Sequence, residues 1–321
     1  MRAMFADMDW SRAIEVLRCA QHVLLTTHRN PDGDGIGAQL ALFHALRGMG
    51  KQVSMFNRDG VPRIYRFLVG ANEIAAGDEP VDHGADVVVS LDCGSARRLG
   101  VSAGFFTGAT HINIDHHRSN QGFGDVRCVD ARYCATGAMV ADLLLAMNVP
   151  FTPEIASALY TSLLTDTGSF RLSNCTADVY RLAEALVRAG ADPSYIARHV
   201  YEAMRPAALR LLGRCLQDMT LRDAGRSAWM VVTQSMFAEV GADVEDTEGL
   251  IDYARSVDGV EVAVLIREDL DVSGCWKVSF RGKTYADVGS LAERLGGGGH
   301  RHAAGCQLRG TREEIAARLF P

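Results

Sequence analysis

Residues 28–37 read His-Arg-Asn-Pro-Asp-Gly-Asp-Gly-Ile-Gly, and they lie where a short apolar run gives way to a helical pattern. The preceding run, residues 23–27, is typical of a buried strand. The apolar residues that follow recur every three or four positions, as on one face of a helix. Polar residues between a strand and a helix occupy the usual ligand-binding edge of an open α/β sheet. His28, Asp32 and Asp34 therefore form a candidate divalent-cation site, although an Asp-Gly turn that caps a helix gives the same local pattern.

Three later elements end in the same kinds of residue. Two strand-like apolar runs and one helix-like run each lead directly to carboxylates or imidazoles. These are residues 85–91 before Asp92, residues 111–114 before Asp115, His116 and His117, and residues 155–164 before Asp166. One such terminus is an ordinary cap or turn, but four in order predict that the fold brings these side chains to one edge.

The order of these residues is specific enough to suggest a family. His-x-x-x-Asp-x-Asp, then Asp, then Asp-His-His, then Asp resembles the DHH phosphoesterase superfamily. Residues 296–305, Gly-Gly-Gly-Gly-His-Arg-His-Ala-Ala-Gly, resemble the glycine-rich motif of the associated DHHA1 domain. Within the superfamily, the chain is most similar to the bifunctional oligoribonuclease and phosphoadenosine-phosphate phosphatase (nanoRNase) family, which it also resembles at residues 115–120 and 245–250.

The predicted fold class is α/β. Alternating strands and helices in the first part predict a mostly parallel sheet with helices on both faces, which the resemblance identifies as a DHH domain over residues 1–190. Residues 191–206, bracketed by Pro193 and Pro206, suit a helical connector. Residues 207–321 predict a smaller α+β domain, and the resemblance implies a DHHA1 substrate-binding domain across a cleft from the first.

Composition limits the class of protein. The chain has 321 residues, 48% of them hydrophobic and 22% charged, which suggests two globular domains. No apolar run approaches the ~20 residues that span a bilayer, and the first residues lack the apolar core of a signal peptide. The eight cysteines include no Cys-x-x-Cys pair, which argues against a zinc knuckle or a disulfide framework. We therefore expect a cytoplasmic protein with no membrane contact.

Charge limits the partners. The net charge of −6 argues against a broad grip on long nucleic acid, and no binding to long duplexes is expected. A short anionic substrate held by a few arginines remains compatible with this charge. Short RNA oligonucleotides and small phosphorylated nucleotides are thus the expected ligands, and a homodimer is left open.

The resemblance implies two divalent metal ions, with manganese as the expected metal. It assigns His28 and Asp32 to the first ion, Asp34, His116 and Asp166 to the second, and Asp92 to both. Carboxylate and imidazole ligands without thiolate favour manganese over structural zinc. A hydroxide between the two ions would then attack phosphorus.

The resemblance also implies roles in substrate binding and catalysis. His117 would face the substrate and either hold a phosphoryl oxygen or protonate the leaving group. Asp115 would orient a histidine from behind, although an ordinary acid at a strand end explains that residue equally well. From the second domain, the residues expected to bind a substrate phosphate are Arg281, Gly298, Gly299 and His300.

The expected activity is hydrolysis of short oligoribonucleotides to mononucleotides, together with removal of the 3′-phosphate of 3′-phosphoadenosine 5′-phosphate. A cyclic-dinucleotide (cyclic di-AMP) or linear-dinucleotide phosphodiesterase is the alternative enzyme, because the metal ligands are common to both. A noncatalytic nucleotide-binding regulator is the alternative from another class. The presence of every expected metal ligand argues against the regulator.

Overall fold

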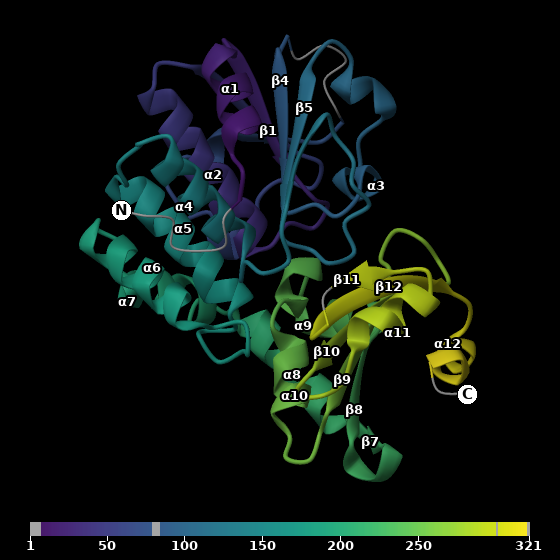
Figure 1. Ribbon diagram of the computed structural model, residues 1–321. Helices are drawn as coiled ribbons and strands as arrows, with labels where there is room; N and C mark the ends of the chain where they lie inside the picture. The colour runs from purple at the N-terminus through teal and green to yellow at the C-terminus, as the bar shows by residue number, and fades with distance from the viewer. Residues whose placement is uncertain (1–7, 79–83, 300, 320–321) are drawn as a thin grey trace. The chain divides into compact units, whose positions relative to one another are not determined.

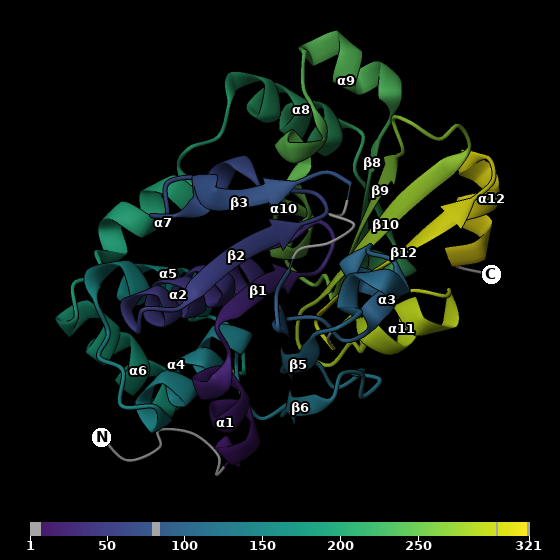
Figure 2. The same ribbon diagram turned by 90° about the horizontal axis from the view of Figure 1, so that it is seen from above.

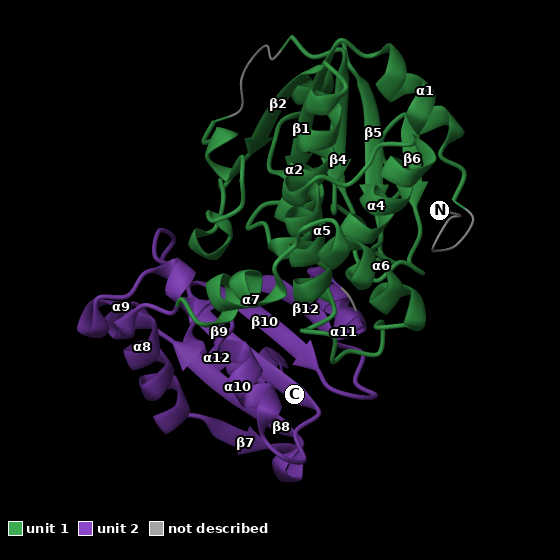
Figure 3. Ribbon diagram, turned by 90° about the vertical axis from the view of Figure 1, so that its left-hand side faces the viewer, with its two compact units in different colours: residues 1–203 green, residues 204–321 purple. Residues whose placement is uncertain are grey.

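Each of the two units into which the chain divides is built on a six-stranded sheet. The first unit comprises residues 1–203 and the second comprises residues 204–321 (Figure 3). The computed structural model describes residues 8–78, 84–299 and 301–319. Within those ranges, no helix combines the length and the apolar character needed to cross a bilayer.

The sheet of the first unit is parallel throughout, with the strand order β3-β2-β1-β4-β5-β6. Figure 2 labels all of these strands except β4. Its strands are β1 (His22–Thr27), β2 (Gln52–Asn57), β3 (Ile74–Ala76), β4 (Val87–Leu91), β5 (Thr110–Asp115) and β6 (Val126–Val129). The central strands β1, β4 and β5 coincide with the apolar runs in the sequence. The edge strands β3 and β6 escape prediction, because they have only three and four residues and neither is buried throughout.

Helices cover both faces of this sheet. They are α1 (Ser11–Cys19), α2 (Gly33–Gly48), α3 (Ala96–Leu99), α4 (Thr136–Ala146), α5 (Pro153–Asp166), α6 (Ala177–Arg188) and α7 (Pro193–Tyr201). Figure 1 shows α2, α4 and α5 on one side of the sheet and α3 on the other. The predicted α/β class, with a parallel sheet between helical layers, is confirmed for this unit.

The side chains of the central strands alternate between two cores. On β1, Leu25 packs into the large core that also contains residues of α2 and α5, whereas Leu24 packs with Val88 and Phe105 on the opposite face. Because both faces are buried, these strands need apolar residues at nearly every position. The helix α7 belongs to the same unit, since Ile196 packs into the large core, and the division between the units follows Ala203.

The second unit is a mixed α+β domain with the strand order β11-β12-β10-β9-β8-β7. Its strands are β7 (Thr220–Arg222), β8 (Ser227–Val232), β9 (Val262–Glu268), β10 (Cys275–Gly282), β11 (Gly298–Gly299) and β12 (Ala303–Arg309). Its helices are α8 (Pro206–Gln217), α9 (Gln234–Val240), α10 (Leu250–Ser256), α11 (Val288–Arg294) and α12 (Arg312–Leu319). The strands pair antiparallel except for β8 and β9.

This second sheet also separates two cores. One contains residues of α8, α9 and α10, including Leu211, Phe237 and Leu250, and the other contains residues of α11 and α12. On β10, Val278 and Phe280 belong to the second core. The alternation of apolar and polar residues along β10 is therefore the alternation between a covered face and a more open one.

Candidate metal centre

The residues predicted as metal ligands lie at one edge of the first sheet, beyond the carboxyl ends of its central strands. They are His28 after β1, Asp92 after β4, His116 after β5, Asp32 and Asp34 at the start of α2, and Asp166 at the end of α5. Parallel strands all end at the same edge, so residues far apart in the sequence meet there.

Three overlapping groups of ligand-type side chains occur at this edge. The Asp34 group consists of Asp34, His116 and Asp166, the Asp32 group consists of His28, Asp32 and Asp92, and a third group, Asp92, His116 and His117, shares residues with both. Within each group, one potential ligand atom from every residue lies within 4.8 Å of the others. Atoms this close together can surround a single divalent cation.

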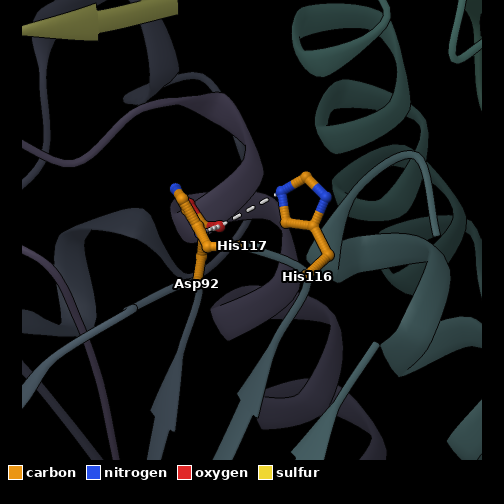
Figure 4. Close-up of side chains that lie close together, drawn as sticks. All are labelled: Asp92, His116 and His117. Carbon is orange, nitrogen blue, oxygen red and sulfur yellow. Dashed lines mark ion pairs between the residues drawn. The ribbon is translucent and has the colours of Figure 1, made fainter. Parts of the chain in front are cut away.

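Asp92 links the two groups. Its Oδ2 lies 3.3 Å from His28 Nε2, and its Oδ1 lies 3.6 Å from His116 Nε2. Figure 4 shows the side chains of Asp92 and His116, from the ends of neighbouring strands, turned toward each other. Because a carboxylate has two oxygens while an imidazole nitrogen has one lone pair, Asp92 is the residue suited to contact two cations.

Asp34 is held by groups that are distant in the sequence. Its carboxylate accepts hydrogen bonds from the backbone N–H groups of Thr136 and Gly137, at 2.6 and 2.8 Å, where α4 begins. Ser162 Oγ of α5 donates a third, at 2.6 Å. Sequence reasoning missed these supporting residues. The available signal was the Thr-Gly pair at the start of a predicted helix, where N–H groups have no partner within the helix.

Asp32 is held locally. Its Oδ1 accepts hydrogen bonds from the backbone N–H groups of Asp34 and Gly35, both at 3.1 Å, and so caps α2. Its side chain is 51% exposed, whereas Asp34 is 1% exposed. From the sequence, Asp32 is either a helix cap or a metal ligand. In the structure it can be both, because the cap uses Oδ1 and the side chain remains exposed.

Backbone carbonyls orient both histidines of the two groups. His28 Nδ1 lies 2.8 Å from the carbonyl oxygen of Arg29, and His116 Nδ1 lies 3.2 Å from that of Tyr133. If Nδ1 carries the proton, each imidazole presents Nε2 to the carboxylates. Tyr133 is itself fixed, because its hydroxyl donates to the buried carboxylate of Asp142 at 2.7 Å.

His117 belongs to a separate hydrogen-bonded chain. Its Nδ1 donates to Asp115 Oδ1 at 2.7 Å, and Asp115 Oδ2 accepts from Asn120 Nδ2 at 2.6 Å. Asn120 Nδ2 also lies 2.8 Å from Asn113 Oδ1. His117 Nδ1 is therefore engaged although it lies 3.5 Å from Asp92, and its Nε2 lies 3.4 Å from Arg98 Nη1.

Burial and neighbouring charges shift the pKa values at this edge. Burial and the charge of Asp34 raise the pKa of Asp92 well above its ordinary range. Burial lowers the pKa of His28, but its contacts with Asp32 and Asp92 outweigh burial and raise that pKa to about 10. Carboxylates crowded away from water favour a bound cation. The donor set, imidazole nitrogens and carboxylate oxygens without a thiolate, fits a divalent cation.

Gly33, Gly35 and Gly37 are grouped at the start of α2. All three lie inside α2, and none has a positive φ. A Cβ at Gly35 would overlap Thr27, and one at Gly37 would overlap the backbone of α5. These glycines therefore allow α2 to pack closely against β1 and α5.

The substrate-binding residues predicted near the C-terminus lie in the second unit. Arg281 is on β10, with its Nη1 donating to the carbonyl oxygen of Phe280 at 3.1 Å. Gly298 and Gly299 form β11 and pair with Gly305 and Ala304 of β12, so part of the glycine run is a strand. His300 lies outside the described residues.

Comparisons with known proteins match both units. The family model "DHH family, N-terminal domain" matches residues 22–163, and the "DHHA1 domain" model matches residues 230–319. Each domain model therefore falls within one of the two units.

Individual relatives span nearly the whole chain. The bifunctional oligoribonuclease and PAP phosphatase NrnA of Thermus thermophilus is 34% identical over 92% of this chain and 87% of the relative. The protein of the same name from Bacillus subtilis is 25% identical over 89% of each chain. A solved structure, an exopolyphosphatase-related protein from Bacteroides fragilis, has a TM-score of 0.87 and 27% identity, over 96% of this chain and 93% of that one.

Proposed function

The chain belongs to the DHH family and carries a DHHA1 domain, and from this premise we propose that it is a metal-dependent phosphoesterase acting on short RNA and on phosphoadenosine phosphate (PAP). It would hydrolyse short oligoribonucleotides to mononucleotides and remove the 3′-phosphate of PAP. The observation that carries the proposal is the 34% identity to an oligoribonuclease and PAP phosphatase over 92% of this chain. The geometry of the Asp34 and Asp32 groups supports it, because it contains every metal ligand expected for such an enzyme.

We propose that the site takes two divalent ions, with manganese as the metal. His28 and Asp32 would hold one ion, Asp34, His116 and Asp166 the other, and Asp92 both. Divalent ions in such a site make water more acidic and polarise a phosphoryl oxygen, which is the chemistry that phosphoester hydrolysis requires. Four carboxylates among the six ligands would offset most of the charge of two dications.

His117 is the proposed catalytic residue outside the metal ligands. Because Asp115 accepts the proton on Nδ1 at 2.7 Å, a second proton on Nε2 would be donated to the phosphoryl oxygen or the leaving oxygen. Asp115 is a positioning residue, since it acts through the imidazole, and Asn120 holds it in turn. In the second unit, Arg281 and the β11 backbone are proposed to bind a further phosphate of the substrate.

The proposal places the enzyme in the cytoplasm. All eight cysteines are free thiols, as is usual in a reducing compartment.

A three-substrate assay tests the activity. We expect manganese-dependent release of mononucleotide from a 5′-labelled RNA dinucleotide and of phosphate from PAP, with both reactions lost in Asp92→Asn. Turnover of cyclic di-AMP alone would replace the proposal with the cyclic-dinucleotide alternative. If none of the three is hydrolysed while manganese binds, the phosphoesterase proposal is wrong and a binding function remains.

A further inference from the structure

An arginine of the first unit lies directly beside His117. Arg98 is on the one-turn helix α3, six residues after Asp92. Its Nη1 is 3.4 Å from His117 Nε2, the imidazole nitrogen opposite the one that donates to Asp115. The guanidinium of Arg98 and the imidazole of His117 therefore lie side by side next to the candidate metal ligands.

The backbone that carries Arg98 is fixed, although its side chain reaches solvent. The carbonyl oxygen of Arg98 accepts the backbone N–H of Arg29 at 2.7 Å, and its own N–H donates to Ser95 at 3.0 Å. At Gly100 the chain turns with a φ of 72°, and a Cβ there would overlap the side chain of Arg29. Glycine suits this left-handed position, and the two backbone hydrogen bonds of Arg98 hold the α3 segment in place.

The positive charge of Arg98 is not neutralised by a neighbouring acid. Within the described part of the chain, no carboxylate forms an ion pair with the Arg98 guanidinium. There, its polar contact is with His117. Its charge nevertheless reaches the metal-ligand edge, where it contributes to the pKa values of His28, Cys93 and His117. A cation so placed next to crowded carboxylates, but paired with none, is suited to an anionic ligand.

We propose that Arg98 is a catalytic residue that binds a non-bridging oxygen of the phosphoryl group under attack. The inference rests on the proposed phosphoesterase function and adds a residue contributed by the first unit. A guanidinium matches phosphoryl oxygens in shape and remains charged at every working pH. In the transition state, charge is spread over the three equatorial oxygens of the phosphoryl group, and a guanidinium positioned there in advance stabilises that charge. On substrate binding, a phosphoryl oxygen replaces His117 Nε2 as the acceptor of the Nη1–H bond.

This role differs from the one proposed for Arg281. Arg281 would hold a phosphate that does not react, so its loss would affect substrates according to whether they have such a phosphate. Arg98 contacts the reacting phosphoryl group, so its loss affects every substrate. The effect is expected mainly on kcat, because the contact is strongest in the transition state.

The chain contains a matched control for Arg98. Arg97 is the preceding residue of α3 and is exposed in the same way, but it has no recorded contact with the candidate site. We would compare Arg98→Ala, Arg98→Lys and Arg97→Ala as full-length, manganese-loaded proteins, using PAP and an RNA dinucleotide. For Arg98→Ala we expect kcat to fall about 10²-fold on both substrates. Arg98→Lys should retain part of the activity, and Arg97→Ala should stay within about twofold of the wild type.

Four further measurements separate catalysis from structure. Bound manganese and the unfolding temperature should be the same in all four proteins. Guanidinium ion added to Arg98→Ala should restore part of kcat, which it would not do for a misfolded site. The dissociation constant for AMP, measured by calorimetry on the manganese-loaded proteins, should rise about 10-fold in Arg98→Ala alone, as for loss of one charge-assisted hydrogen bond.

The outcomes also separate this inference from the proposed function. Wild-type kcat in Arg98→Ala, an equal loss in Arg97→Ala, or a loss explained by missing manganese would each overturn the role of Arg98. If the wild type hydrolyses no substrate, the proposed function fails. The AMP measurement then still decides whether Arg98 belongs to a phosphate site, because equal binding by wild type and Arg98→Ala would refute it.

Discussion

The Asp34 group and the Asp32 group differ in what holds their ligands. Asp34 is buried and accepts three hydrogen bonds from α4 and α5. Asp32 is half exposed and accepts only from the first turn of its own helix. One half of the centre therefore depends on tertiary structure, while the other depends on a local helix cap.

This difference has a consequence for metal binding. Ligands held from several elements lose little freedom when a cation binds, so the Asp34 group is organised in advance. The Asp32 group has an exposed ligand that must be ordered on binding. We therefore expect two manganese-binding events of unequal affinity, the tighter one at the Asp34 group. Calorimetric titration of metal-free protein would show this, and a single class of equal sites would contradict it.

The largest effect is expected from Asp92, which both groups share. Asp92 has a φ of 54°, and asparagine tolerates that left-handed conformation. Asp92→Asn thus removes the charge without disturbing the turn, and Asn can still accept the hydrogen bond from Thr136. We expect both metal-binding events to weaken and activity to fall at least about 10³-fold.

The same substitution should stabilise the metal-free protein. Because burial and the charge of Asp34 raise the pKa of Asp92, the fold disfavours its charged form, and a neutral side chain removes that cost. The melting temperature in chelator should therefore rise above that of the wild type. A lower melting temperature would mean that Asp92 stabilises the fold even without metal.

Substitutions of Asp32 and Asp34 test the comparison directly. In Asp34→Asn, an amide N–H would face the N–H donors of α4 or the hydroxyl of Ser162, so we expect a loss of about 1–3 kcal/mol of unfolding free energy and loss of the tighter manganese. Asparagine caps helices as well as aspartate does, so Asp32→Asn should change stability by less than about 0.5 kcal/mol. It should weaken only the second manganese. Equal loss of stability in the two variants would break the distinction between the groups.

The support of Asp34 can be disturbed without changing a ligand. A Cβ at Gly137 would overlap the side chain of Ser162, which would push the start of α4 away from Asp34. Gly137→Ala should cost about 1–3 kcal/mol and lower the affinity of the tighter manganese about 10- to 100-fold. Gly48→Ala, at the end of α2, meets no atom within 4 Å and is the control. Unchanged affinity in Gly137→Ala would show that α4 does not organise Asp34.

The same distinction explains what the sequence could predict. Strands such as β1 and β4 are predictable because burial on both faces demands unbroken apolar runs. The ligands are predictable as types, since each follows such a run, and Asp32 carries a local helix-cap signal as well. The supports of Asp34 lie more than 100 positions away, so no local pattern reveals them. Arg98 cannot be predicted from the sequence for a similar reason, because its contact with His117 depends on how the α3 turn packs.

The smallest effect on the centre is expected from His111, which supports the fold behind it. Its ring is buried, stacks on Phe106 with 4.2 Å between centroids, and lies 2.9 Å from Ser90 Oγ. Burial lowers its pKa from 6.5 to about 4, against a weaker opposing effect of Asp125. The fold therefore favours the neutral imidazole. This contribution is complete above pH 6.5 and is lost as the pH falls from 6.5 toward 4.

Protonation of His111 sets the lowest pH at which metal binding to the Asp34 and Asp32 groups can be compared. At lower pH, weaker metal binding could reflect unfolding of the protein. Between pH 7 and pH 5, the metal-free wild type should lose about 2 kcal/mol more unfolding free energy than His111→Gln, which has no imidazole to protonate. Urea denaturation at the two pH values measures the difference. At pH 7 and above, His111→Gln should bind both manganese ions like the wild type, since His111 supplies no ligand. If the unfolding free energies of the two proteins fall in parallel with pH, the acid sensitivity arises from a group other than His111. That group would then set the lowest pH at which metal binding to the Asp34 and Asp32 groups can be compared.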